Sequence, residues 1–167
     1  PGFEDVLGLP ASPRIALLVM DGLGWESLRA NSADAPFLHS LLPAARPLTA
    51  GFPSTTAASV ASIGMGLPPG EHGLVGYTMT LPGHSKAMNV LRWSVYGQNQ
   101  GSGTRNDLLD KIPPEKLQPR SSALEAAAAD GVGVLLVGPA DHEKSGLSRA
   151  SLRAGRFRSI VSAGDLV

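Results

Sequence analysis

The sequence has no cysteine, and this absence removes several kinds of chemistry. A chain without cysteine forms no disulfide, offers no thiolate to a zinc ion and has no cysteine nucleophile. It also has no excess of charge, because 14 basic residues balance 14 acidic residues. Without a net field that attracts polyanions, we expect the protein to bind neither nucleic acid nor an anionic membrane.

Long apolar runs are lacking too. The longest, Ile15–Met20, is far shorter than the about 20 residues that cross a bilayer, so we expect no membrane span. Two motifs of hydrolases are missing, the GxSxG nucleophile elbow and the GxxxxGK[ST] phosphate loop. These absences weaken a serine hydrolase and a P-loop enzyme as explanations. The chain begins at Pro1 rather than at a methionine, which leaves an upstream segment and the compartment open.

The residues that are present predict one folded domain of the α/β class. A length of 167 residues with 43% hydrophobic and 17% charged residues is typical of a globular chain. The continuous apolar run at 14–20 predicts a strand that is covered on both faces. After this run, apolar residues recur at helical spacing, and a capping box at Ser122–Glu125 predicts the start of a later helix. We expect helices at 25–30 and 35–42, a helix from Thr55 or Thr56 to about Met65, and a helix at 123–129. We expect strands at 14–20, 77–81, 88–93 and 132–137, and a short strand at 47–50. This alternation predicts a mostly parallel sheet flanked by helices.

Two further patterns concern the C-terminal third of the chain. Four arginines, Arg149, Arg153, Arg156 and Arg158, form the only basic cluster, which we interpret as a solvated face rather than an anion site. Residues 163–167 have the pattern of a helix start with Asp165 as its cap. A chain rarely stops at a helix start, so we expect residues 1–167 to be the N-terminal part of a single domain.

Asp21 is the first candidate functional residue. It follows the apolar run directly and precedes Gly22, within the sequence MDGLG. In an open α/β sheet, ligands bind beyond the carboxyl ends of the strands, which is where we expect Asp21. A capping aspartate for the next helix is the simpler alternative.

Thr55 and Thr56 are the second candidates, because we expect them to lie where a strand gives way to a helix. A threonine hydroxyl becomes a good nucleophile when a base or a metal lowers its pKa. Free N–H groups and the helix dipole at the same helix end favour a bound phosphate. An ordinary helix cap is again the simpler alternative, and on this segment alone it is preferred.

The order of three segments resembles a known family. MDGLG, then FPSTTA, then GMGLPPGEHGLVGY is similar to the nucleotide pyrophosphatase/phosphodiesterase family of the alkaline phosphatase superfamily. The resemblance implies an alkaline-phosphatase-like core, two zinc ions, and a small phosphate ester or nucleotide as substrate. It implies that Asp21 is a zinc ligand and that Thr56 is both a zinc ligand and the nucleophile. Thr55 then stands where the family often has lysine.

The resemblance also shows where this sequence departs from the family. The HG of the last motif matches His72-Gly73, and in the family that histidine does not bind metal, so we interpret His72 as a loop histidine. The asparagine that holds phosphate in the family aligns with Tyr77, which we expect to bind substrate with a different geometry. The remaining zinc ligands of the family are not evident. We interpret Asp141-His142 as a surface loop, His39 as a helix surface residue and His84 as part of a turn.

The expected reaction is an in-line attack of Thr56 on phosphorus, which gives a phospho-threonine intermediate, with two zinc ions clamping the attacking and leaving oxygens. One alternative is a phosphomonoesterase, phosphonate hydrolase or phosphomutase of the same superfamily. Another is a non-catalytic module that binds a partner, since one aspartate and one threonine cannot satisfy two zinc ions. The oligomeric state stays open.

Overall fold

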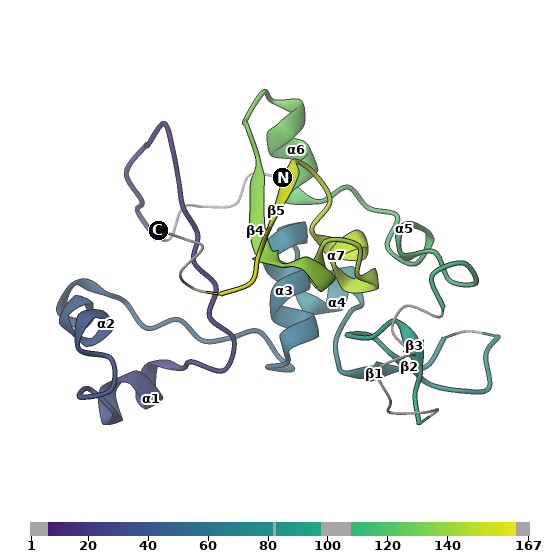
Figure 1. Ribbon diagram of the computed structural model, residues 1–167, viewed down its shortest axis with the longest axis horizontal. Helices are drawn as coiled ribbons and strands as arrows, with labels where there is room; N and C mark the ends of the chain where they lie inside the picture. The colour runs from purple at the N-terminus through teal and green to yellow at the C-terminus, as the bar shows by residue number, and fades with distance from the viewer. Residues whose placement is uncertain (1–6, 82, 98–107, 163–167) are drawn as a thin grey trace. The chain divides into compact units, whose positions relative to one another are not determined.

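The computed structural model describes residues 7–81, 83–97 and 108–162 (Figure 1). The chain divides into two compact units, unit 1 at Pro1–Leu48 and unit 2 at Thr49–Val167, and each is described by itself. The predicted helix start at 163–167 lies outside the described residues.

The described elements are mostly short. Unit 1 contains α1 (Trp25–Ala30), α2 (Pro36–Leu41) and the 3₁₀ turn η1 (Leu42–Ala44). Unit 2 contains the helices α3 (Thr56–Met65), α4 (Pro69–His72), α5 (Pro114–Leu117), α6 (Ala123–Ala129) and α7 (Gly146–Ser151), the 3₁₀ turn η2 (Ala140–His142), and the strands β1 (Thr78–Met79), β2 (Met88–Asn89), β3 (Ser94–Val95), β4 (Leu135–Pro139) and β5 (Arg156–Ile160). Among the described helices, none combines the length and the apolar character needed to cross a bilayer.

Unit 1 has the two predicted helices but lacks the predicted strand. The segment 14–20 has no strand hydrogen bonding, and its apolar side chains are exposed, with Ile15 at 80% and Leu17 at 71%. A strand that is covered on both faces needs paired neighbours, and none of the described residues of unit 1 forms a strand beside it. The prediction of a buried strand here was wrong.

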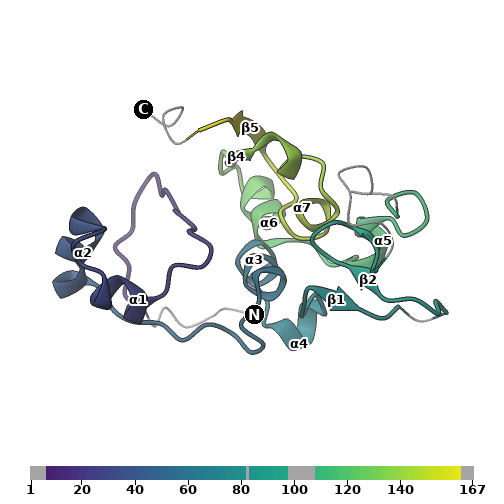
Figure 2. The ribbon, with the colours of Figure 1, turned by 60° about the horizontal axis from the view of Figure 1, so that its bottom comes forward.

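Helix α3 lies at the centre of unit 2, beside α4, α6 and α7 (Figure 2). Its small residues Ala57, Ala58 and Ala61 are fully buried. Gly64 explains how closely α7 can approach, because a Cβ at this position would lie 2.1 Å from the backbone oxygen of Ser151. The helix ends at Gly66, whose φ of 66° gives the left-handed conformation that glycine adopts without strain.

The apolar core of unit 2 is built around Trp93. Its side chain is completely buried, and its indole Nε1–H donates to the backbone oxygen of Ile112 at 2.8 Å. Gly146 begins α7 directly against the ring, since a Cβ there would lie 2.1 Å from a ring carbon. The core also contains Ala57, Ala61, Leu74, Leu81, Met88, Val90, Leu108, Leu147 and Ala150. These contacts bring α3, α7 and the β1–β3 region into one packed body.

The described strands form two small sheets, so the fold mixes helices with both kinds of strand pairing. Strands β1, β2 and β3 form an antiparallel sheet, with Met79 opposite Met88 and Met88 opposite Val95. Strands β4 and β5 are parallel, with Leu135 opposite Arg156. The predicted strands at 77–81 and 88–93 are therefore confirmed in shortened form. The strand predicted at 132–137 begins later, at Leu135, and that residue is 56% exposed rather than buried.

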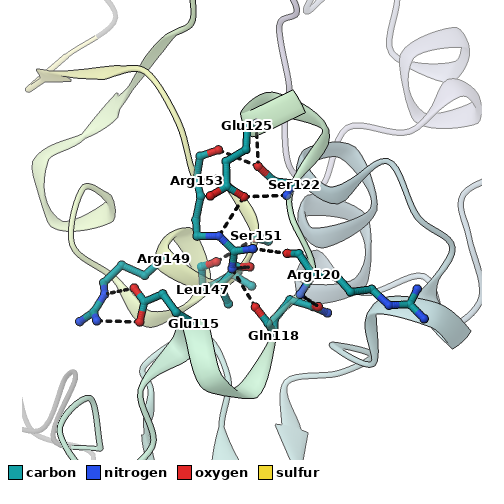
Figure 3. A network of polar contacts seen from close by, with 10 residues as sticks. Glu115, Gln118, Arg120, Ser122, Glu125, Leu147, Arg149, Ser151 and Arg153 are labelled. Atoms are coloured by element: carbon teal, nitrogen blue, oxygen red, sulfur yellow. Dashed lines mark hydrogen bonds and ion pairs between the residues drawn. The ribbon is translucent and has the colours of Figure 1, made fainter. Parts of the chain in front are cut away.

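Two of the four clustered arginines join helices rather than forming a solvated face (Figure 3). Arg149 makes a bidentate ion pair with Glu115, with Nε–Oε1 and Nη2–Oε2 distances of 2.8 and 2.9 Å. Arg153 binds Glu125 at 3.1 Å and donates to the backbone oxygens of Gln118, Ala150 and Arg120. Its side chain is only 16% exposed, so its donors satisfy carbonyls that water reaches poorly.

This network ties α7 to α5 and α6, and it shows that the interpretation of the cluster as a solvated face was wrong for Arg149 and Arg153. Arg156 and Arg158 are exposed on β5, where that interpretation holds.

Candidate functional site

The two threonines occupy different positions at the start of α3. Thr55 is the cap residue, with extended backbone angles of φ −115° and ψ 153°, and Thr56 is the first helical residue. The Ala58 N–H donates to Thr55 Oγ1 at 3.2 Å, which satisfies one of the open donors of the first turn. Both threonines are half-buried. The capping interpretation is therefore confirmed for Thr55.

The Thr55 hydroxyl also works as a donor. Its Oγ1–H donates to the backbone oxygen of Val75 at 2.9 Å, across twenty positions of sequence. A hydroxyl has one proton to donate, and here that proton is committed to a carbonyl. As a nucleophile Thr55 would have to give up this bond and its cap.

His72 forms a second connection to α3, and its burial and hydrogen bonding were not predicted from the sequence. It ends α4 and is only 4% exposed, so it is a buried helix residue rather than a loop histidine. Its Nδ1 accepts the Leu74 N–H at 3.1 Å, and its Nε2 lies 3.0 Å from Ser62 Oγ on α3. Because Nδ1 accepts a hydrogen bond, the ring proton of the neutral form belongs on Nε2, which donates to Ser62.

The surroundings of His72 disfavour its charged form. Burial lowers the pKa of His72 below its ordinary value of 6.5, and the backbone of Ala58 offsets this only in part. Protonation at Nδ1 would also remove the acceptor that the Leu74 N–H uses. The backbone oxygen of His72 accepts a further bond, from Gln118 Nε2 at 2.6 Å. His72 is therefore neutral, and its hydrogen bonds attach the end of α4 to α3.

Tyr77 lies at the end of the same connection, directly before β1. Its backbone oxygen accepts the Val90 N–H at 2.9 Å, which fixes this point to the strand β2 region. Its ring meets Tyr96 edge to face, with centroids 6.3 Å apart and planes at 87°. The side chain stays 47% exposed, so the ring is held while much of its surface remains open to a ligand.

Asp21 lies in unit 1, in an exposed turn with Gly22, whose φ is 76°. The expected strand before it is absent among the described residues, so the aspartate is presented by a turn rather than by a sheet edge. Thr56 and Tyr77 lie in unit 2. The structure thus brings Thr55, Thr56 and the segment that leads to Tyr77 together within one unit.

The other candidate ligands are dispersed. Asp141 and His142 are both about half exposed in η2, with Oδ1 and Nε2 3.9 Å apart, as expected for a surface loop. His84 is exposed, as predicted, whereas His39 is half-buried on α2. Over residues 7–81, 83–97 and 108–162, no three histidine, aspartate or glutamate side chains gather into a group that could hold a metal ion.

Two hollows in the described part lie away from the candidate residues. One, of about 610 Å³, is an open depression over α1 and α2 that Trp25, Arg29 and His39 line. The other, of about 200 Å³, has an apolar floor of Met88, Leu81 and Ile112 and a rim that includes Lys86 and Lys111. Neither is lined by Asp21, Thr56 or Tyr77, so we place the candidate site by side-chain chemistry and not by hollow size.

Comparison with known proteins gives one match. The family model for type I phosphodiesterase / nucleotide pyrophosphatase matches residues 15–129, which is more than half of the chain and includes Asp21, Thr56 and Tyr77. Neither a curated protein nor a solved structure matches significantly.

The pH dependence of stability tests the buried neutral state of His72. Because its pKa is lowered on folding, the unfolded chain binds the extra proton as pH falls below 6.5, and the free energy of unfolding should decline from that point. Above pH 6.5 its contribution should be constant. Chemical unfolding between pH 8 and 5, followed by Trp93 fluorescence in a Trp25→Phe background, measures this.

The matched control is His72→Gln, which cannot titrate and should lose most of the decline between pH 6.5 and 5. Glu115 and Glu125 do not contribute to the change in the free energy of unfolding between pH 6.5 and 5. Their pKa values are lowered from 4.5, by the Arg149 hydrogen bond for Glu115 and by hydrogen bonds that outweigh burial for Glu125. Their contributions are present above pH 4.5 and are lost below it. An equal decline in the wild type and in His72→Gln would contradict the assignment.

Proposed function

The chain belongs to the type I phosphodiesterase / nucleotide pyrophosphatase family, and on this basis we propose that it forms the part of a hydrolase that supplies the nucleophile for cleaving phosphodiesters or nucleotide pyrophosphates. In this proposal Thr56 attacks phosphorus and Tyr77 contacts the phosphoryl group. The described elements belong to the N-terminal part of an alkaline-phosphatase-like catalytic domain. The observation that carries the proposal is the family match over residues 15–129, which includes Thr56 and Tyr77. In the proposal, Thr55 has a structural role, because its hydroxyl accepts the Ala58 N–H and donates to the Val75 oxygen.

The proposed reaction has two steps. Thr56 Oγ forms a bond to phosphorus while the bond from phosphorus to the leaving ester oxygen breaks, and the threonine proton ends on the leaving group, which departs as an alcohol. Water then cleaves the bond between Thr56 Oγ and phosphorus and regenerates the hydroxyl. The N-terminus of α3 favours the negative charge on the phosphoryl oxygens, because first-turn N–H groups and the helix dipole are directed there.

Zinc is the cofactor that we propose for the intact protein, with Asp21 and Thr56 among its ligands. When bound, zinc would lower the pKa of a hydroxyl and stabilise the leaving oxygen. The described residues do not by themselves complete such a centre, since zinc is held by about four ligands.

A second candidate function follows from Tyr77. Its ring is fixed against Tyr96 and presents a phenol to the phosphoryl group, where the resemblance implies an amide. A phenol hydroxyl has one proton to donate, so it recognises the phosphoryl oxygens differently. The second candidate is therefore a phosphomonoesterase, phosphonate hydrolase or phosphomutase of the same superfamily. The ratio of kcat/KM for a nitrophenyl phosphate monoester to that for the corresponding diester separates the two functions.

Replacing the nucleophile tests the proposed function. Thr56→Ala should lower kcat for a nitrophenyl phosphodiester by at least about a thousandfold in the intact protein, because no other hydroxyl takes its place. Thr80→Ala is the matched control, since Thr80 is exposed in the same unit and should retain full activity. Circular dichroism and unfolding curves of both variants should match the wild type. Full activity in Thr56→Ala would exclude Thr56 as the nucleophile.

Removal of metal tests the proposed cofactor. Dialysis of the intact protein against a chelator should abolish hydrolysis, and stoichiometric zinc should restore it. Activity that persists in protein shown to be free of metal would contradict the zinc assignment.

A further inference from the structure

We propose that Thr55 is a positioning residue, whose hydroxyl sets the nucleophile Thr56 relative to the phosphoryl contact Tyr77. It does so by holding the segment His72–Tyr77, here called the return segment, against the first turn of α3. The inference rests on the proposed function, because it takes the roles of Thr56 and Tyr77 from there. It adds a role for Thr55 that neither the motif nor the family match assigns.

The first argument is the position of the hydrogen bond from Thr55 to Val75. Thr55 is the direct neighbour of Thr56, and Val75 is two residues from Tyr77. The 2.9 Å bond between Thr55 and Val75 therefore links the neighbourhoods of the two proposed functional residues across twenty positions of sequence. A shift of Val75 away from α3 would carry Tyr77 with it.

The second argument is that Thr55 is itself held on every side. Its N–H donates to the Pro53 oxygen at 2.9 Å, and its own oxygen accepts the Ser59 N–H at 2.9 Å. Its Oγ1 accepts from Ala58 N at 3.2 Å while donating to Val75. A side chain bonded in this way has one orientation. Its hydrogen bonds therefore fix the position of the return segment relative to the first turn of α3.

The third argument is that the return segment is fixed at both ends. At its start, the buried His72 bonds Ser62 on α3 and receives a bond from Gln118. At its end, the Tyr77 oxygen accepts from Val90 and the ring packs on Tyr96. Between these anchors, the Val75 oxygen accepts the bond from Thr55 at the start of α3. Its loss should loosen the middle of the segment without unfolding unit 2.

This arrangement predicts an effect on turnover more than on binding. Small misplacements of a nucleophile relative to the phosphoryl group are costly for the chemical step, of the order of a hundredfold for 1 Å. Without the Thr55 hydroxyl, we therefore expect kcat to fall by roughly 10- to 100-fold. KM should change by less than about threefold, because Tyr77 and the helix N-terminus remain present.

Three substitutions in the intact protein separate the possible roles. Thr55→Val keeps the shape and removes the hydroxyl. Thr55→Ser keeps both hydrogen bonds. Thr55→Asp keeps an acceptor for the Ala58 N–H but, being ionised, has no proton to donate to Val75. Amide hydrogen exchange is followed for all three, and kcat and KM with a nitrophenyl phosphodiester are measured for the first two, since the charge of aspartate would itself repel an anionic substrate.

The expected result is faster exchange over residues 72–77 in Thr55→Val and Thr55→Asp, with exchange in α7 unchanged. Thr55→Val should show the fall in kcat, and Thr55→Ser should restore both exchange and turnover. Wild-type kcat in Thr55→Val would overturn the inference. So would slow exchange of 72–77 in Thr55→Asp, because the cap alone would then account for the bonding.

These outcomes are distinct from a failure of the proposed function. Hydrolysis that is absent from the wild type, or that survives Thr56→Ala, would remove the proposed reaction. The exchange data then decide the positioning role alone. Faster exchange over 72–77 in both Thr55→Val and Thr55→Asp supports it, and unchanged exchange in either variant overturns it.

Discussion

The hydroxyl of Thr55 is the interaction on which the candidate site depends. It accepts the Ala58 N–H and donates to the Val75 oxygen, so one oxygen caps α3 and also holds the return segment in place. Each bond alone would contribute about 1 kcal/mol. They matter here for the relative position of two segments, since together they join the start of a helix to a segment twenty residues later.

The packing of unit 2 makes this connection between the start of α3 and the return segment possible. Helix α3 is built from small residues, which let α4 and α7 approach closely, and Gly64 removes the Cβ that would otherwise meet the Ser151 backbone. His72 is buried in the same interface and stays neutral, because burial lowers its pKa. The same residues that fill the core therefore determine where the proposed nucleophile lies.

Local patterns in the sequence predicted part of this structure correctly. The start of α3 and the capping box at Ser122–Glu125 follow from side chains that bond their own neighbours. The helices of unit 1 were predicted from the helical spacing of their residues. The family match over residues 15–129 confirms the resemblance that three short motifs indicated. Asp21, Thr56 and Tyr77 as functional residues stay predictions, as do the zinc ions.

Other features could not be predicted because they depend on residues far apart in the sequence. The apolar run at 14–20 has the composition of a buried strand, but a strand also needs paired neighbours, which composition does not supply. The bond from Thr55 to Val75, the contact of His72 with Ser62 and the carbonyls gathered by Arg153 are all tertiary. The signals that could have drawn attention to them were a polar histidine after a small-residue helix and arginines spaced near glutamates.

The most direct test of the account is to locate the covalent intermediate. The intact protein is mixed with a phosphodiester substrate, quenched in acid within the first turnovers, digested and examined by fragmentation mass spectrometry. The account predicts a phosphoryl group on Thr56, on the peptide that contains both threonines. A phosphoryl group on Thr55, or on any residue other than Thr56, would contradict it.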